Sequence, residues 1–159
     1  MNDERIISIY PNTFGFGYAI LSDKGEILDN GMISIRPVNN DKCFKRIQEI
    51  ISYFLPEILI IENPENSNKS KRVKALLAKI ANYGKGNLKI YKYSKEQIRN
   101  TFEVFNAKNK FEISRKISEV YPELKNKLPE KRKVWEPENY YQGIFDALSL
   151  VHTHYYLTN

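Results

Sequence analysis

Two carboxylates stand in apolar surroundings where an isolated charge is costly. Glu62 directly follows the apolar run 58–61, and Asp146 lies within the apolar stretch 144–148. A buried carboxylate needs a cationic partner, hydrogen bonds or a metal ion. Glu62 could therefore serve only in a cap or an ion pair, and Asp146 could pair with Lys110 or Arg115. Alternatively, both carboxylates face one cleft and bind Mg²⁺, which prefers hard oxygen ligands.

Positive charge is concentrated in a few short segments of the chain. The sequence has 25 Lys and Arg against 19 Asp and Glu, a formal net charge of +6. Such clusters are typical of proteins that contact nucleic-acid phosphates, although they are also found on solvated helix faces. The candidate nucleic-acid-binding residues are Lys69, Lys71, Arg72, Lys74, Lys108, Lys110, Arg115, Lys131, Arg132 and Lys133.

The hydrophobic pattern predicts the elements that must position these residues. Three antiparallel strands open the chain, and helical and strand-like segments then alternate. The predicted strands are 5–10, 14–22, 27–35, 58–61 and 88–93; the predicted helices are 41–55, 73–83, 95–102, 111–121 and 138–156, with a loop at 122–137. This order predicts an α/β fold with a mixed five-stranded sheet and helices on both faces. The end of the first strand, the end of the fourth and the last helix can then converge at one edge.

The length and composition bound the class of protein. The 159 residues fit one domain, and 42% hydrophobic with 28% charged residues is a globular balance. No apolar run approaches the ~20 residues of a membrane span. The N-terminus lacks the pattern of a signal peptide, and Cys43 is the only cysteine. We therefore expect a single domain over 1–159, no membrane partner and a cytoplasmic location.

Three short motifs occur in one order along the chain. Residues 9–13 read Ile-Tyr-Pro-Asn-Thr and are followed by Gly17-Tyr18; the second motif is the strand that ends in Glu62; the third is 146–148, Asp-Ala-Leu, with His152 or His154 beyond it. Together they resemble the RuvC-like Holliday junction resolvases of the ribonuclease H-like superfamily. The resemblance covers nearly the whole chain. It implies a ribonuclease H-like fold, a Mg²⁺-dependent endonuclease that acts on branched DNA, and a homodimer.

The departures from this family pattern fall on the metal-binding positions. The family's first-strand Asp is replaced by Tyr10, a phenol that ionises only near pH ~10. The further acid before the helical Asp is replaced by Gly143, with Glu138 or Asn139 as the nearest substitute on the predicted helix. Lys110 matches the position at which the family carries a basic residue near the scissile phosphate of its substrate. The resemblance thus gives Glu62, Asp146, Glu138 and Lys110 as catalytic candidates, with Glu62 and Asp146 as metal ligands.

Three functional hypotheses follow. In the leading one, the chain binds branched or structured DNA, and the family's nuclease activity is weakened or lost because Mg²⁺ binding is weak or absent. In the second, Glu62, Asp146 and Glu138 support an active Mg²⁺-dependent junction resolvase. In the third, the scaffold is a protein-interaction module that uses the old cleft or the tyrosines of the final helix.

Overall fold

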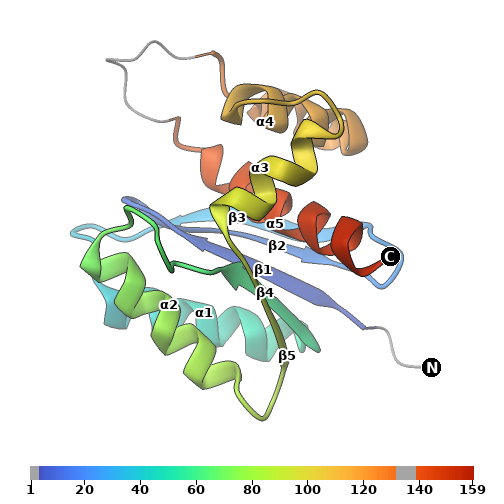
Figure 1. The fold of residues 1–159 in the computed structure, drawn as a ribbon. Helices are drawn as coiled ribbons and strands as arrows, with labels where there is room; N and C mark the ends of the chain where they lie inside the picture. The colour runs from blue at the N-terminus through green and yellow to red at the C-terminus, as the bar shows by residue number, and fades with distance from the viewer. Residues whose placement is uncertain (1–3, 132–138) are drawn as a thin grey trace.

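The computed structural model describes residues 4–131 and 139–159, which form one five-stranded sheet with helices on both faces (Figure 1). The strands are β1 (Ile6–Pro11), β2 (Gly15–Leu21), β3 (Ile27–Ser34), β4 (Ile58–Glu62) and β5 (Lys89–Tyr93). The helices are α1 (Asn40–Phe54), α2 (Lys71–Gly84), α3 (Lys95–Glu103), α4 (Lys110–Val120), the 3₁₀ helix η1 (Pro122–Lys127) and α5 (Gln142–Thr158). The predicted fold class is confirmed.

The sheet has the order β3-β2-β1-β4-β5, so β1 lies in its centre. The pairs β1–β2 and β2–β3 are antiparallel, whereas β1–β4 and β4–β5 are parallel. Because β1 and β4 run in the same direction, their carboxyl ends meet at one edge of the sheet. This edge is where β1 delivers Tyr10 and β4 delivers Glu62.

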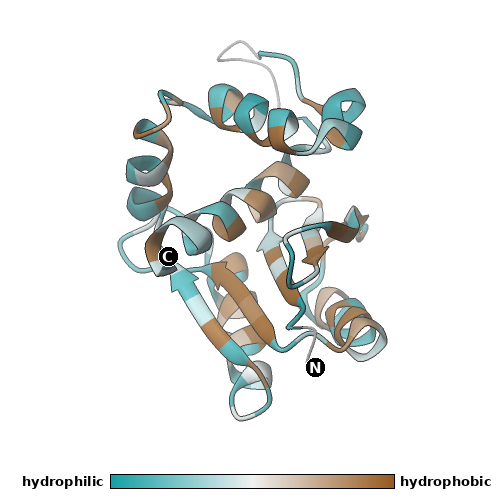
Figure 2. Cartoon of the chain, turned by 90° about the vertical axis from the view of Figure 1, so that its right-hand side faces the viewer, coloured by the Kyte–Doolittle hydropathy of each residue, from teal (hydrophilic) through white to brown (hydrophobic). Residues whose placement is uncertain are grey.

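Alternate residues of β1 face two separate halves of the core. Ile7 and Ile9 pack with α1 and α2 on one face, whereas Ile6 and Tyr10 pack with α5 on the other. The sheet interior is mostly apolar, and the helices carry apolar and polar residues on different sides (Figure 2). Ser8 is buried on the α5 side and donates a hydrogen bond of 2.7 Å to the carbonyl oxygen of Ala147. The centre of α5 is thereby fixed against β1.

The helix starts follow local capping chemistry. The Ser94 side chain accepts from the backbone N–H of Gln97, and the Gln97 side chain accepts from that of Ser94, which makes a complete capping box for α3. Asn109 caps α4 through one hydrogen bond, which its side chain accepts from the backbone N–H of Glu112, and that helix begins at Lys110. These two caps place the first residues of α3 and α4 near the edge where β1 and β4 end.

Two parts of the predicted secondary structure were wrong. The predicted loop from 122 contains the helix η1, which is held by the buried Leu124. The last helix begins at Gln142 and not at 138: the Asn139 side chain accepts from the backbone N–H of Tyr141, a local turn that competes with helix. Asn139 is therefore outside the helix that carries Asp146. In the described part of the chain, no helix is long and apolar enough to cross a membrane.

Candidate functional site

Tyr10, Glu62 and Asp146 lie around one pocket of about 180 Å³ at the edge where β1 and β4 end. Asp146 reaches this edge from the second turn of α5, which crosses the sheet above β1. The side chains of Glu62 and Asp146 are almost fully buried, since the residues are 2% and 5% exposed. The three separate elements named by the sequence motifs thus bring these residues together.

Lys69 contacts both Tyr10 and Glu62 from the segment that precedes α2. Its Nζ lies 2.6 Å from the Tyr10 hydroxyl oxygen and 3.6 Å from Glu62 Oε2. The ammonium is also 4.3 Å from the centre of the Tyr10 ring, a cation–π distance. Glu62 Oε2 is buried and accepts no hydrogen bond from the described residues, so the Lys69 ion pair is its main compensation there. Lys69 and Tyr10 are 59 residues apart in the chain.

Lys110 pairs with the second carboxylate. Its Nζ lies 3.4 Å from Asp146 Oδ2 and 6.0 Å from the centre of the Tyr10 ring. Gln142, one turn before Asp146 on α5, donates 3.2 Å to Asp146 Oδ1 and 3.1 Å to Ser114 Oγ. The structure therefore contains the Lys110–Asp146 ion pair that the sequence left open. Arg115, the other candidate partner, packs over the Phe111 ring at 5.9 Å.

Gly143 allows α5 to approach the sheet closely at the position of the family's further acid. A Cβ at Gly143 would lie 2.4 Å from Met32 Sδ and 2.7 Å from Asn12 Nδ2. A Cβ at Gly17 of β2 would lie 2.3 Å from the backbone carbonyl carbon of Gly143. Two glycines thus meet at the α5–β2 contact, and a side chain at either position requires α5 or its neighbours to shift.

The structure places the predicted nucleic-acid-binding residues in different surroundings. Lys69 and Lys110 line a pocket beside Tyr10, and Lys108 lines the pocket that holds the two carboxylates. Lys71, Lys74, Arg115 and Lys131 are exposed. Arg72 donates 2.7 Å to the carbonyl oxygen of Asn12 and 3.2 Å to Asn40 Oδ1, so it braces the β1–β2 turn. Arg132, Lys133 and Glu138 lie outside the described residues.

Two basic residues at this pocket were missed by the sequence reasoning. Lys95 and Arg99, from the first turns of α3, line the same pocket as Glu62 and Asp146. The signal was available in principle, because β5 runs parallel to β4 and α3 follows directly after its carboxyl end. Lys95, Arg99, Lys108 and Lys110 together make the rim of the pocket strongly basic.

Among residues 4–131 and 139–159, no group of three or more His, Cys, Asp and Glu side chains is arranged to hold a metal ion. His154 Nδ1 lies 2.6 Å from the Tyr93 hydroxyl, and His152 lines a pocket that shares no residue with the one around Glu62. The described carboxylates at the edge are thus Glu62 and Asp146, each with a lysine ammonium beside it.

The sheet order and the helices on both faces define the class: this is a RuvC-like α/β fold of the ribonuclease H-like type. RuvC of Thermus thermophilus matches with a TM-score of 0.64 and 16% identity over 96% of this chain and 93% of that chain. The same RuvC in complex with a Holliday junction substrate matches with a TM-score of 0.65 and 15% identity over 96% and 92%. The fowlpox virus resolvase in complex with its substrate Holliday junction DNA matches with a TM-score of 0.54 and 14% identity over 97% of this chain and 99% of that chain.

At these identities, the similarity establishes the fold and not the activity. No protein-family model matches the sequence, and a search of curated proteins gives no match.

Proposed function

We propose that this chain binds branched or structured DNA, and that the metal-dependent endonuclease activity of RuvC-like proteins is weakened or lost in it. The observation that carries the proposal is the position of Lys69, whose ammonium contacts both the Tyr10 hydroxyl and the Glu62 carboxylate. A divalent cation at Glu62 would have to displace this ammonium and fit beside an aromatic ring. Such a cation would therefore bind weakly.

The number of ligands supports the same conclusion. A two-metal mechanism places ions about 3.5–4 Å apart and clamps the attacking and leaving oxygens, which calls for several carboxylates. In the described chain, Glu62 and Asp146 would be the carboxylate ligands of Mg²⁺, and each already has a lysine partner. Mg²⁺ would supply a Lewis acid for phosphodiester cleavage, but two carboxylates fit one weakly held ion better than a pair.

DNA binding is supported by the basic rim and by the fold. Lys95, Arg99, Lys108 and Lys110 line the pocket between α3, α4 and α5, and Lys69 borders it at Tyr10. Ammonium and guanidinium groups at one edge can neutralise adjacent phosphates and release their counterions. The similar RuvC and fowlpox proteins were solved with junction DNA. We extend that substrate class to this chain, with residues 1–159 as one domain and a homodimer as the working assembly.

An active nuclease is the second candidate, and one observation favours it. Glu62 and Asp146 line the same pocket, and the side chains of Lys69 and Lys110 are 24% and 45% exposed. These long side chains could swing toward phosphates and leave the two carboxylates to Mg²⁺, with Glu138 as a third ligand. The two candidates differ in whether junction cleavage depends on metal and on Glu62.

A binding measurement tests the proposal directly. A fluorescently labelled four-way junction and a linear duplex of the same sequence are titrated in EDTA at low salt. We expect the junction to bind more tightly than the duplex without any metal ion. Lys110→Met should weaken junction binding and lower the salt slope by about one unit, because one phosphate contact is lost. Lys89→Met is the matched control, since Lys89 pairs with Glu4 at the opposite end of β5. Equal or undetectable binding of both DNAs would contradict the proposal.

A further inference from the structure

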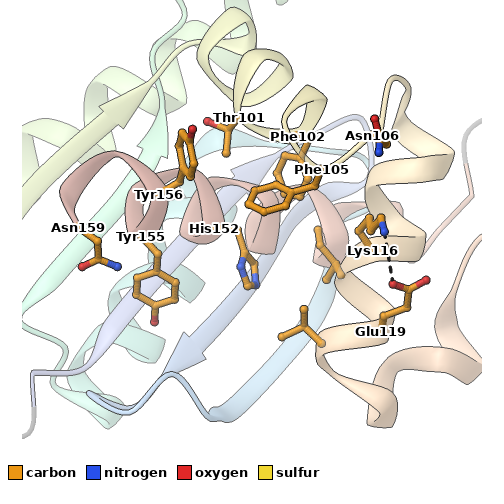
Figure 3. Close-up of a pocket in the computed structure, with 12 residues that line it drawn as sticks. Thr101, Phe102, Phe105, Asn106, Lys116, Glu119, His152, Tyr155, Tyr156 and Asn159 are labelled. Atoms are coloured by element: carbon orange, nitrogen blue, oxygen red, sulfur yellow. Dashed lines mark ion pairs between the residues drawn. The ribbon is translucent and has the colours of Figure 1, made fainter.

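A further pocket is lined by other residues of α3, α4 and α5 and is separate from the two pockets at the basic edge. Its volume is about 670 Å³, within the range of small-molecule sites, and it shares no lining residue with the pockets around Tyr10. Figure 3 shows side chains from all three helices around it. Nothing in the proposed DNA-binding function uses this pocket, so its chemistry can be considered independently.

Aromatic rings make up much of the pocket wall. Phe102 is buried at its base, whereas Phe105 and Tyr156 are 50% and 46% exposed at its rim. The rings of Phe105 and Tyr156 meet edge to face, with centroids 6.0 Å apart. Tyr155 contributes a further ring from α5 (Figure 3). Exposed aromatic surface around a concave site is typical of recognition by stacking and edge-to-face contact.

His152 supplies a buried polar atom in this apolar setting. It lines the pocket, and its Nε2 is buried with no hydrogen-bond partner among the described residues. Its ring is enclosed by Tyr121 and Tyr155, with centroid distances of 5.5 Å and 5.9 Å. A buried nitrogen with no partner is costly, so a ligand atom or a water that reaches it after a small movement of the surrounding side chains would be favoured by the new hydrogen bond.

The charges at the pocket compensate one another. Lys116 and Glu119 of α4 form an ion pair with a distance of 3.8 Å between Nζ and Oε2. Burial lowers the pKa of His152 to about 4, so this imidazole is neutral at physiological pH. The other polar lining groups, such as the amides of Asn106 and Asn159, are uncharged. The lining side chains therefore carry no net charge that would attract an ionic ligand.

We propose that this pocket binds a neutral, planar heteroaromatic molecule that packs on Phe105 and Tyr156 and forms a hydrogen bond with His152 Nε2. The ring surface accounts for affinity, and the imidazole nitrogen accounts for preference among rings of equal size. The site goes beyond the proposed DNA function and does not depend on it.

The test uses benzimidazole as the probe, because at pH 7.5 it is a neutral planar bicycle with one N–H donor and one nitrogen acceptor. It can therefore bond to either tautomer of His152. Indane, a bicycle of equal size without nitrogen, is the matched control. Each is titrated into the full ¹⁵N-labelled chain, and amide chemical shifts are recorded. We expect saturable shifts confined to α3, α4 and α5, with tighter binding of benzimidazole.

Two variants separate the hydrogen bond from the ring contacts. His152→Phe keeps a ring but removes the nitrogen, so it should weaken benzimidazole binding about tenfold and leave indane unchanged. Phe105→Ala, at an exposed rim position, should weaken both ligands severalfold through lost ring contact. An unchanged amide spectrum outside the pocket shows that each variant is folded.

Three outcomes would overturn the proposal: no saturable shift with benzimidazole, an equal loss of affinity for both ligands in His152→Phe, or unchanged affinity for both in Phe105→Ala.

Competition with an unlabelled four-way junction shows whether the natural ligand is a base of DNA or a free small molecule. Displacement of benzimidazole would assign the site to an unpaired base, and no displacement would assign it to a free small molecule. Both results require ring binding at this pocket. Junction affinity of the wild-type chain, measured separately in EDTA without benzimidazole, tests the DNA proposal on its own.

Discussion

Lys69 Nζ lies 2.6 Å from the Tyr10 hydroxyl, although the two residues come from the segment before α2 and from the central strand β1. The same ammonium is 3.6 Å from Glu62 Oε2. The Lys69 ammonium and the Tyr10 phenol therefore both lie near the buried Glu62 carboxylate at this edge of the sheet. Lys110 repeats the arrangement at Asp146, with 3.4 Å between Nζ and Oδ2.

The first prediction concerns the stability of the Lys69–Glu62 pair. Lys69→Met removes the cation and leaves the buried Glu62 carboxylate uncompensated, which should lower the free energy of unfolding by about 1–3 kcal/mol. Glu62→Gln in the same chain should restore part of this loss, because the remaining amide carries no charge. Urea unfolding of the two single variants and the double variant measures the coupling. Additive losses would show that the two groups do not interact.

The second prediction concerns the close approach of α5 to β2. Gly17→Ala places a Cβ 2.3 Å from the carbonyl carbon of Gly143, so α5 must move away from the sheet. We expect a loss of about 2–4 kcal/mol, as for other strained core substitutions. Gly84→Ala is the control, because its Cβ would meet only side-chain ends of Ile90 and Leu59 at 3.1 Å. The midpoint of thermal unfolding should change much less in Gly84→Ala than in Gly17→Ala. Equal shifts of the midpoint in the two variants would show that the α5–β2 contact does not need glycine.

The third prediction concerns the pH dependence of stability. Burial lowers the pKa of His152 to about 4, whereas in the unfolded chain it is near the ordinary value of ~6.5. Between these values the unfolded state binds the additional proton, so the free energy of unfolding falls as the pH is lowered. The neighbouring Tyr121 and Tyr155 are uncharged in this range, and Lys116 is paired with Glu119.

Lowering the pH from 7.5 to 5.0 should therefore cost about 2 kcal/mol through His152 alone. His152→Phe removes this contribution, and its unfolding free energy should be less dependent on pH by that amount. Urea titrations of both proteins at the two pH values provide the measurement. An identical pH dependence would show that this imidazole titrates normally in the folded chain.

Much of the fold could be predicted from the sequence, because its signals are local and periodic. Residues 58–61 are an uninterrupted apolar run, as expected for a strand with both faces covered, and together with Glu62 they form β4. The predicted strands 14–22 and 27–35 are joined by a short turn, in which Gly25 has a positive φ of 82°, a conformation that favours glycine. The meeting of Glu62 and Asp146 followed from the element order.

The remaining features depend on contacts that no local pattern encodes. Lys69 is one of several lysines in a basic segment, and only the tertiary structure selects it to reach Tyr10. Asn139 was expected on the last helix, but its side chain forms a turn that delays the helix to Gln142. Gly143 was interpreted only as a missing acid, whereas in the structure it also permits the contact with Gly17.

Cleavage of a labelled four-way junction distinguishes a protein that binds the junction without cutting it efficiently from an active nuclease. The purified chain is incubated with junction in Mg²⁺, in Mn²⁺ and in EDTA, and the products are separated on denaturing gels. We expect the junction to be bound and to be cleaved weakly or not at all under all three conditions, in wild type as in Glu62→Gln and Asp146→Asn. Efficient metal-dependent cleavage that disappears in either variant would contradict the proposal and establish an active nuclease at this site.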